Sequence, residues 1–234
     1  MDQRAHTVKS YDEELGRLVN TIARMGGVAE AQLASAIQSV AKRDSELSER
    51  VISGDAKVDE FESEIHKQVM RLLALRQPVA VDLRNIVVAL KISSDIERIA
   101  DYAANVAKRA MILNQIPPVK PVVAISRMGR LAQELTRAVL DAYVERNLDK
   151  AIDVWKRDEE VDEMYGSLFR ELITYMMEDP RNITACTHLM FIAKNIERIG
   201  DHATNIAESI HFLIKGAALV GARPKGDKVL GAGL

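Results

Sequence analysis

The sequence predicts an all-α protein built as two pseudo-symmetric antiparallel three-helix bundles, related by internal duplication. The first observation is a repeat: residues 95–107 read DIERIADYAANVA, residues 195–207 read NIERIGDHATNIA, and 8 of the 13 positions are identical. The second is the placement of the prolines, which leaves long stretches of helical periodicity between positions 78, 117, 118, 121, 180 and 224. The third is an aromatic content of only 4%, without alternating β-branched runs.

The first half should contain three long helices, because its apolar residues recur every three or four positions. We expect these helices over residues 7–43, 45–76 and 82–114. Gly26 and Gly27 weaken the first helix without ending it, and Asp44 is a suitable N-cap for the second. The N-terminal bundle is therefore predicted to comprise residues 1–116.

The pattern restarts after a stiff proline-rich link at residues 115–121. The helices of the second half are expected from Met128 to Ala142, from the cap residue Asn147 to Asp179, and from Pro180 to about Lys215. These helices define a predicted C-terminal bundle over residues 122–215. Residues 216–234 contain five of the twelve glycines of the chain and are predicted to form a mobile tail.

Composition excludes several classes of protein. Lys and Arg number 32 against 34 Asp and Glu, and a formal net charge of −2 is unlike that of a nucleic-acid-binding protein. Cys186 is the single cysteine, so no intrachain disulfide can form, which favours a reducing compartment. The N-terminal residues lack the apolar core of a signal peptide, and no apolar run is long enough to span a membrane. We therefore expect a cytoplasmic protein.

Carboxylates one helical turn apart recur at four places in the chain. The four pairs are Asp55/Asp59, Glu97/Asp101, Asp158/Asp162 and Glu197/Asp201. Each lies roughly opposite the apolar stripe of its helix, so we expect it to face solvent. The second and third helices of a bundle are neighbours, so the two pairs of each half could meet on one outer surface. Four oxygen-bearing side chains suit hard cations such as Mg²⁺, Mn²⁺, Ca²⁺ or iron.

The alternative interpretation is that these carboxylates only form solvated faces, with Arg98 and Arg198 supplying local ion pairs. The symmetric recurrence of the pairs in both halves favours metal binding. A structural zinc site of the Cys/His type has no support, because no Cys/His cluster is present. His202 is at best a ligand at the edge of the site, since it points about 100° away from Asp201 on a helix.

No catalytic constellation is evident. Cys186 and His188 lie on different faces of a helix, and no second base accompanies them, so a buried or inert thiol is the favoured interpretation. No phosphate-binding loop between a strand and a helix is present. The sequence therefore predicts a binding or regulatory protein rather than an enzyme.

These segments together resemble the PhoU family of bacterial phosphate-uptake regulators. The resemblance covers roughly residues 5–214 and depends on the paired IERIxD segments, on MGGVAEAQ at 25–32, on RQPVAVDLR at 76–84 and on the acidic pairs. It implies a surface metal cluster in each half. The ligands would be Asp55, Asp59, Glu97 and Asp101 in the first half and Asp158, Asp162, Glu197 and Asp201 in the second. The metal would be a divalent or trivalent ion, such as iron, Mn, Mg or Zn.

The resemblance also implies a function and partners. Such a protein is a non-catalytic cytoplasmic adaptor, a homodimer that reaches the membrane only through its partners and binds no nucleic acid. It couples the ATPase subunit of the phosphate ABC transporter to a sensor histidine kinase, and represses the phosphate-starvation response when phosphate is plentiful. Two other hypotheses stay open at this point: a metal-dependent phosphoesterase, and a helical scaffold without metal.

Overall fold

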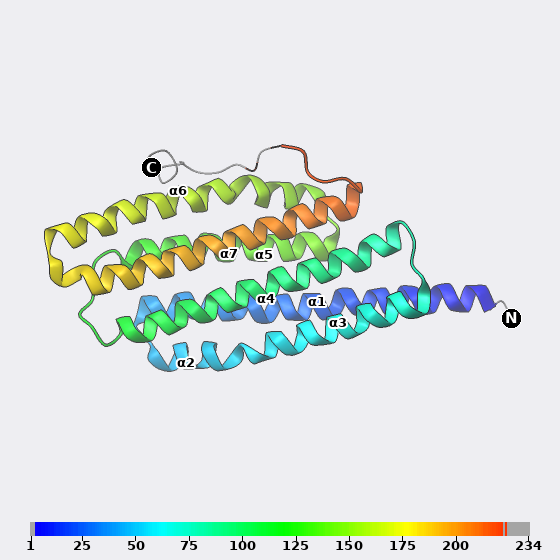
Figure 1. Ribbon diagram of the computed structural model, residues 1–234, viewed down its shortest axis with the longest axis horizontal. Coiled ribbons are helices and arrows are strands. Elements are labelled where there is room, and N and C mark those ends of the chain that lie inside the picture. The colour runs from blue at the N-terminus through cyan, green and yellow to red at the C-terminus, as the bar shows by residue number, and fades with distance from the viewer. Residues whose placement is uncertain (1–2, 222, 224–234) are drawn as a thin grey trace.

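The structure, a computed structural model, describes residues 3–221 and 223, and all regular secondary structure in this part of the chain is helical, without a strand (Figure 1). Its elements are α1 (Gln3–Lys42), α2 (Ser45–Gly54), α3 (Ala56–Arg76), α4 (Val81–Leu113), α5 (Val122–Glu145), α6 (Leu148–Glu178), a short 3-10 helix η1 (Pro180–Asn182) and α7 (Ile183–Lys215). The all-α fold class is confirmed.

The expected second helix is interrupted, and here the prediction of one continuous element over 45–76 was wrong. α2 ends at Gly54 and α3 begins at Ala56, with Asp55 between them. Glycine is a poor helix former, and the chain restarts with a bond from the Val58 amide to the Asp55 carbonyl (2.9 Å). The interruption falls at Asp55, a predicted metal ligand, so the helix break sets where this carboxylate lies relative to α4.

Both predicted N-caps are confirmed. Asp44 precedes α2 and its Oδ1 accepts a hydrogen bond from the Leu47 amide at 2.9 Å. Asn147 precedes α6 and its Oδ1 accepts one from the Lys150 amide at 3.1 Å. Each cap satisfies an amide that the helix itself leaves unpaired, so the two halves begin their second helix by the same device.

Each half is a three-helix bundle, with α2 and α3 together taking the place of one helix in the first. Helices α4 and α7, which carry the two copies of the repeat, lie side by side and run in opposite directions (Figure 1). The buried apolar side chains of both halves form one continuous hydrophobic core. The predicted domain limits, 1–116 and 122–215, therefore stay a prediction.

Two glycines let the halves approach each other closely. A Cβ atom on Gly26 of α1 would lie 2.8 Å from a methyl carbon of Leu140 on α5. A Cβ on Gly129 of α5 would lie 2.5 Å from the Cδ1 atom of Ile37 on α1. Gly26 corresponds to Gly129, and Ile37 corresponds to Leu140, each at an offset of 103 positions. The two contacts are therefore related by the same duplication as the repeat.

Over the described residues, no helix is both long and apolar enough to cross a membrane. Of the predicted mobile tail, the structure describes residues 216–221 and Arg223, which we call the C-terminal strap. The strap turns away from α7 at Gly216, a residue with a left-handed backbone (φ 74°). Residues 222 and 224–234 lie outside the described residues.

Candidate functional site

The predicted carboxylates gather between the last two long helices of each half. The first acidic cluster comprises Asp55, Asp59, Glu97 and Asp101, and lies where the start of α3 faces α4. The second acidic cluster comprises Asp158, Asp162, Glu197 and Asp201, and lies between α6 and α7. Asp55 interacts with Asp101 across the first of these interfaces, and Asp158 and Asp201 share Arg223 across the second. That the four residues of a half form one metal site stays a prediction.

In the first acidic cluster the carboxylates repel one another across the two helices. The pKa of Asp55 is raised, first by burial and then by the charges of Asp101 and Asp59, against the opposing charge of Lys108. Because Asp101 comes from α4 and Asp55 from the α2–α3 break, two separate elements contribute to this negative charge. Such a concentration of charge favours binding of a cation or of a proton.

Glu97 is the most perturbed member of this cluster. Burial, followed by the charge of Asp101, raises its pKa to about 7, although the charge of Arg98 acts in the opposite direction. Arg98 pairs with both acids of its own helix, at 3.2 Å from its Nε to Glu97 Oε2 and 3.1 Å from its Nη1 to Asp101 Oδ2. Its side chain is 54% exposed, so this arginine neutralises the cluster from the solvent side.

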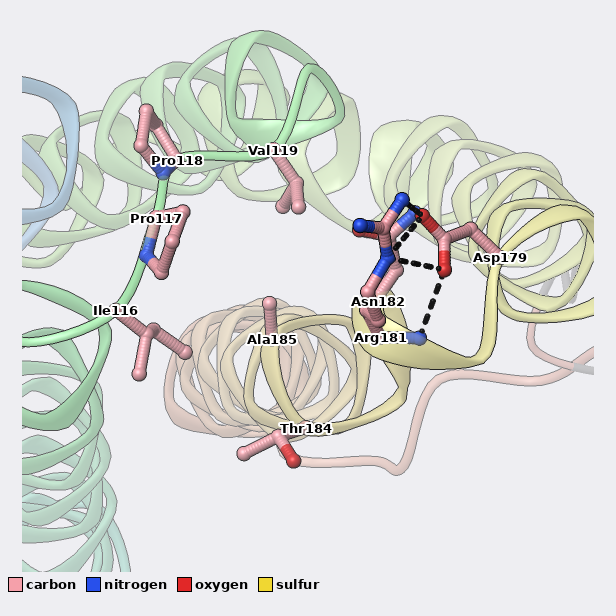
Figure 2. Close-up of a pocket in the computed structure, with 9 residues that line it drawn as sticks. All are labelled: Ile116, Pro117, Pro118, Val119, Asp179, Arg181, Asn182, Thr184 and Ala185. Atoms are coloured by element: carbon pink, nitrogen blue, oxygen red, sulfur yellow. Dashed lines mark hydrogen bonds and ion pairs between the residues drawn. The ribbon is translucent and has the colours of Figure 1, made fainter.

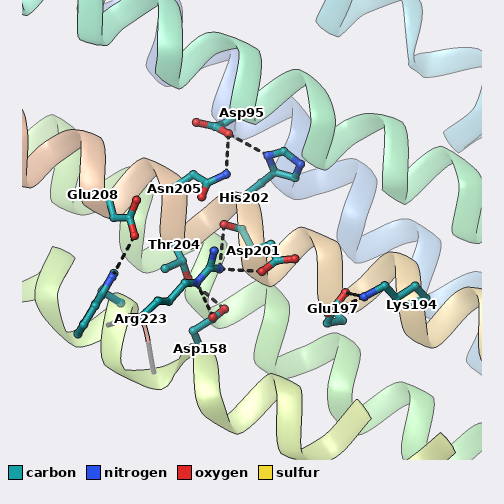
Figure 3. A network of polar contacts seen from close by, with 11 residues as sticks. Asp95, Asp158, Lys194, Glu197, Asp201, His202, Thr204, Asn205, Glu208 and Arg223 are labelled. Carbon is teal, nitrogen blue, oxygen red and sulfur yellow. Dashed lines mark hydrogen bonds and ion pairs between the residues drawn. The ribbon is translucent and has the colours of Figure 1, made fainter. Parts of the chain in front are cut away.

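The second acidic cluster is organised around a different arginine (Figure 3). Arg223 of the C-terminal strap donates from Nε to Asp158 Oδ2 at 2.8 Å, and its Nη2 lies 2.8 Å from Asp201 Oδ1. The same Nη2 donates to the backbone carbonyl of Asp201 at 3.2 Å. Thr204 donates from Oγ1 to the other oxygen of Asp158 at 3.1 Å. Asp158 is therefore bound on both carboxylate oxygens.

Glu197 of the second cluster has a separate cation, Lys194. Lys194 Nζ lies 2.6 Å from Glu197 Oε2 and 2.7 Å from its Oε1. Burial raises the pKa of Glu197, and this hydrogen bond from Lys194 opposes that effect. Asp162 lies one turn after Asp158 on α6 and is half-buried.

The prediction that the acidic pairs face solvent was wrong for several of these residues. Asp158 is 2% exposed, and the side chains of Glu97 and Glu197 are 16% and 13% exposed. The physical reason is that each row flanks the apolar stripe, where the neighbouring helix covers it, rather than lying directly opposite. Asp59 alone among the eight is fully on the surface.

The two clusters differ in their fit to a metal ion. Within residues 3–221 and 223, no three His, Cys, Asp or Glu side chains lie close enough together to bind one metal ion. In the first cluster, carboxylates from two elements raise one another's pKa by charge repulsion, and carboxylate oxygens are the groups that hard cations prefer. In the second cluster the guanidinium of Arg223 already lies between Asp158 and Asp201.

Sequence reasoning missed a polar bridge between the halves. Asp95 on α4 accepts at Oδ1 from His202 Nδ1 (2.8 Å) and from Asn205 Nδ2 (3.4 Å), both on α7. A clue was present, because the two copies of the repeat differ at these positions: Asp95 corresponds to Asn195, and His202 to Tyr102. When the copies pack antiparallel, the differing residues face each other.

The arginines behave partly as expected. Arg98 forms the local ion pairs that the solvated-face interpretation assigns to it. Arg198 lies instead over the ring of Tyr102, 5.5 Å from its centroid, and so joins α7 to α4. Nothing in the sequence indicated Arg223, Lys194 or Thr204 as partners of the acids, because none belongs to the identical positions of the repeat.

The inert-thiol interpretation of Cys186 is confirmed as to burial. The thiol is fully buried, and burial raises its pKa. His188 lies beside Arg109, whose Nη1 is 3.4 Å from its Nδ1, and burial followed by that charge lowers the pKa of His188. A buried protonated thiol is a poor nucleophile.

A cavity of about 390 Å³ lies at the far end of the molecule, between the proline-rich link and the start of α7 (Figure 2). Pro117, Pro118 and Val119 line one side of it, and the turn from α6 into η1 lines the other. Its two charged residues form an ion pair, because Arg181 Nη2 lies 2.8 Å from Asp179 Oδ2. The backbone amide and the Nε atom of Arg181 also donate to Asp179 Oδ1. No free charge in this lining is directed at a ligand.

The molecule is thus a duplicated all-helical protein with two related sites. Each of its two joined three-helix bundles has an acidic cluster between its last two long helices. A family model described as the PhoU domain matches residues 22–110 and 125–210, once in each half. The chain belongs to the PhoU family.

Relatives and solved structures agree with this membership. The chain is 56% identical to the phosphate-specific transport system accessory protein PhoU homolog of Caulobacter vibrioides, over 95% of this chain and 97% of the relative. It is 50% identical to the homolog of Xylella fastidiosa, over 95% and 92% of the two chains.

Two crystal structures have the same fold. The structure of PhoU from Pseudomonas aeruginosa has a TM-score of 0.86 and 36% identity, covering 88% of this chain and all 100% of that one. The phosphate transport system regulatory protein PhoU from Streptococcus pneumoniae has a TM-score of 0.84 and 28% identity, covering 90% and 99%.

Proposed function

We propose that this chain is a non-catalytic accessory protein of a phosphate transport system. It acts in the cytoplasm, contacts the ATPase subunit of the phosphate ABC transporter and a sensor histidine kinase, and keeps phosphate-starvation genes off when phosphate is plentiful. What supports the proposal is the extent of the similarity. Relatives named as phosphate-specific transport system accessory proteins align with it over nearly their whole length.

The first acidic cluster is the part of the molecule that we propose binds a cation. Asp55, Asp59, Glu97 and Asp101 would hold it, and a divalent or trivalent ion would supply the positive charge that these carboxylates lack. The observation that carries this is the mutual repulsion of Asp55 and Asp101 across two helices. Because hard cations prefer several oxygen ligands, iron, Mn or Mg suits the cluster better than Zn does.

Cation binding would give the adaptor a means of changing its docking surface. The first acidic cluster lies where α3 packs against α4, with Asp59 exposed. Its net charge is negative when no ion is bound and falls in magnitude when one is bound. Charge complementarity governs which partners associate and how fast, so occupancy would select the partner that this face accepts.

A pull-down with metal analysis tests both parts of the proposal. In one variant Glu97, Asp101, Glu197 and Asp201 are replaced by Ala. We expect this variant to lose bound metal and to retain less of the transporter ATPase subunit and of the kinase than the wild type does. A control variant replaces four exposed acids of α2, α3 and α6 that belong to neither cluster: Glu49, Glu64, Glu163 and Glu171.

The outcomes separate the alternatives. If the cluster variant keeps both its metal content and its partners, the adaptor proposal fails. If the wild type carries no metal but binds both partners, the scaffold without metal is correct. Turnover of simple phosphate esters by the Mn²⁺-loaded or iron-loaded wild type, absent from the cluster variant, would instead make the protein a phosphoesterase.

A further inference from the structure

The C-terminal strap supplies the second acidic cluster with a cation from the chain itself. Arg223 is 22 residues beyond Asp201 in sequence, yet its guanidinium contacts Asp158 on α6 and Asp201 on α7. Asp158 is almost fully buried, and its side chain is 3% exposed. A buried carboxylate without a partner is costly, so the strap stabilises this charge while it stays in place.

Further contacts fix the course of the strap. His211 Nδ1 lies 3.1 Å from the carbonyl oxygen of Ala217, just after α7 ends. Ala218 and Leu219 then line a cavity of about 330 Å³ with Val88 of α4 and Phe212 of α7. Beyond them Gly221 lies against the ring of Trp155 on α6. The strap thus passes from the end of α7 back over α6, as the red segment in Figure 1 shows.

The internal duplication provides a comparison for this contact. Asp158 corresponds to Asp55 at an offset of 103 residues, and Asp201 corresponds to Asp101 at an offset of 100. In the second half the two carboxylates share one guanidinium. In the first half Asp101 pairs with Arg98 of its own helix, and the charges of Asp55 and Asp101 repel each other. The first pair is followed in the chain by the proline-rich link, and no residue of that link reaches Asp55 or Asp101 among the contacts of the described chain.

We propose that the strap is an intramolecular competitor, which closes the second acidic cluster to external cations by placing Arg223 between Asp158 and Asp201. A cation enters this cluster only after the strap has left it, whereas in the first acidic cluster it competes with Arg98, whose side chain is 54% exposed. The two halves therefore bind cations with different affinities. The apparent affinity of the second falls in proportion to the fraction of time that the strap is open.

Trp155 gives a direct reading of the position of the strap, because it is the only tryptophan of the chain and a Cβ atom on Gly221 would lie 3.9 Å from its Cη2 atom. Acrylamide quenching of its fluorescence should be about 2-fold stronger in Arg223→Gln than in the wild type, because loss of both ion pairs of Arg223 shifts the strap toward the open state. Arg181→Gln is the matched control. It removes an arginine next to the other end of α7 that pairs only with Asp179, and it should leave quenching unchanged.

Cation binding is measured in a background that isolates the second cluster. The double variant Asp55→Asn/Asp101→Asn disables the first cluster, and Mn²⁺ is titrated into it by electron paramagnetic resonance with Arg223 present or replaced by Gln. If the strap is closed about nine-tenths of the time, Arg223→Gln tightens Mn²⁺ binding about 10-fold. In the wild type, saturating Mn²⁺ should displace the strap. Acrylamide should then quench Trp155 more strongly than it does in a metal-free sample.

The metal part of this test depends on the cation binding proposed above, and the two can fail separately. If no variant binds Mn²⁺ at either cluster, the proposed metal function fails, while the quenching of Trp155 still decides whether Arg223 holds the strap. If the first cluster binds Mn²⁺ and Arg223→Gln does not tighten binding at the second, the competitor proposal is overturned. Equal quenching in the wild type and Arg223→Gln overturns it as well.

Discussion

The two halves of the molecule repeat the same acids but neutralise them in different ways. In the first half the helix breaks at Asp55, and the acids face a partly exposed arginine of their own helix, Arg98. In the second half α6 runs without a break through Asp158, which is buried beneath a strap that contributes Arg223. Duplication has therefore kept the positions of the carboxylates and not the counter-ions around them. The two sites differ in exposure at one pair only: Asp55 is half-buried and Asp59 exposed, whereas Asp158 is buried and Asp162 half-buried. Asp101 and Asp201 are equally exposed, at 37%.

The glycines between α1 and α5 offer the sharpest way to break this comparison. A Cβ on Gly129 would lie within 2.9 Å of three atoms of Ile37, two of them on its branched Cβ, whereas a Cβ on Gly26 would come that close only to one terminal methyl group of Leu140, at 2.8 Å. Replacing a helical glycine by alanine gains about 1 kcal/mol in helix propensity, and overpacking costs about 1–3 kcal/mol. Because three atoms of Ile37 would lie so close, we take the upper end of that cost, about 3 kcal/mol, and after the gain in propensity we expect Gly129→Ala to lower the free energy of unfolding by about 2 kcal/mol.

Gly26→Ala serves as the matched variant, with an expected change near zero because Leu140 can rotate away. Urea unfolding followed by circular dichroism measures both. Equal effects of the two substitutions would contradict this expectation, because the two contacts would then be equally tightly packed.

The hydroxyl that binds Asp158 is a feature of the second half alone. Thr204 corresponds to Ala104 in the first half, so only the second cluster has this donor. Thr204→Val keeps the shape of the side chain and leaves a buried carboxylate oxygen without its hydrogen bond. We expect a loss of about 1.5 kcal/mol of stability, since hydrogen bonds to charged groups contribute about 1.5–3 kcal/mol.

Thr187→Val is the control for this change, because the Thr187 hydroxyl is exposed and bonds only the Ile183 carbonyl of its own helix. Its effect on urea unfolding should be under about 0.5 kcal/mol. If Thr204→Val proves as mild, then water or Arg223 takes over the oxygen of Asp158, and the second cluster is less dry than its burial indicates.

Local features of the fold could be predicted from the sequence, and contacts between distant elements could not. Helical periodicity, the proline positions and the caps at Asp44 and Asn147 act within a few residues, so they gave the helices and their order. The break at Asp55 was missed because the apolar stripe continues through it. Arg223 was missed because its contact depends on a segment without periodicity folding back onto α6.

The caps are where the two halves should behave alike. Asp44 and Asn147 occupy related positions and each accepts one amide hydrogen bond at the start of a helix. Asp44→Ala and Asn147→Ala should each cost about 1 kcal/mol of stability. Thermal unfolding of the two variants checks this. A difference of more than about 1 kcal/mol between them would show that the interruption after α2 lets the first half adjust to the loss of its cap.

The smallest expected effect is a change with pH at the first acidic cluster. The pKa of Glu97 is about 7 in the folded protein, above its ordinary value, so the folded state holds this proton more tightly than the unfolded state does. Below the ordinary pKa both states are protonated and the stability from this group is fully present; it is lost as the pH rises through about 7. Gln resembles the protonated acid, so Glu97→Gln should match the wild type at acidic pH and exceed its stability at pH above 7.

The gain should be only about 0.5 kcal/mol, because solvent screens this partly exposed group and the substitution also loses the pairing with Arg98. Urea unfolding in a chelating buffer across this pH range measures it, with the exposed Glu60→Gln as control. Glu197→Gln sharpens the comparison between the halves. Burial raises the pKa of Glu197 too, but Lys194 pairs with both of its carboxylate oxygens, so the substitution discards a stronger ion pair and should give no gain. If Glu97→Gln shows the same difference from the wild type at every pH, or if Glu197→Gln gains as much, then the two clusters do not differ in how their charge is compensated.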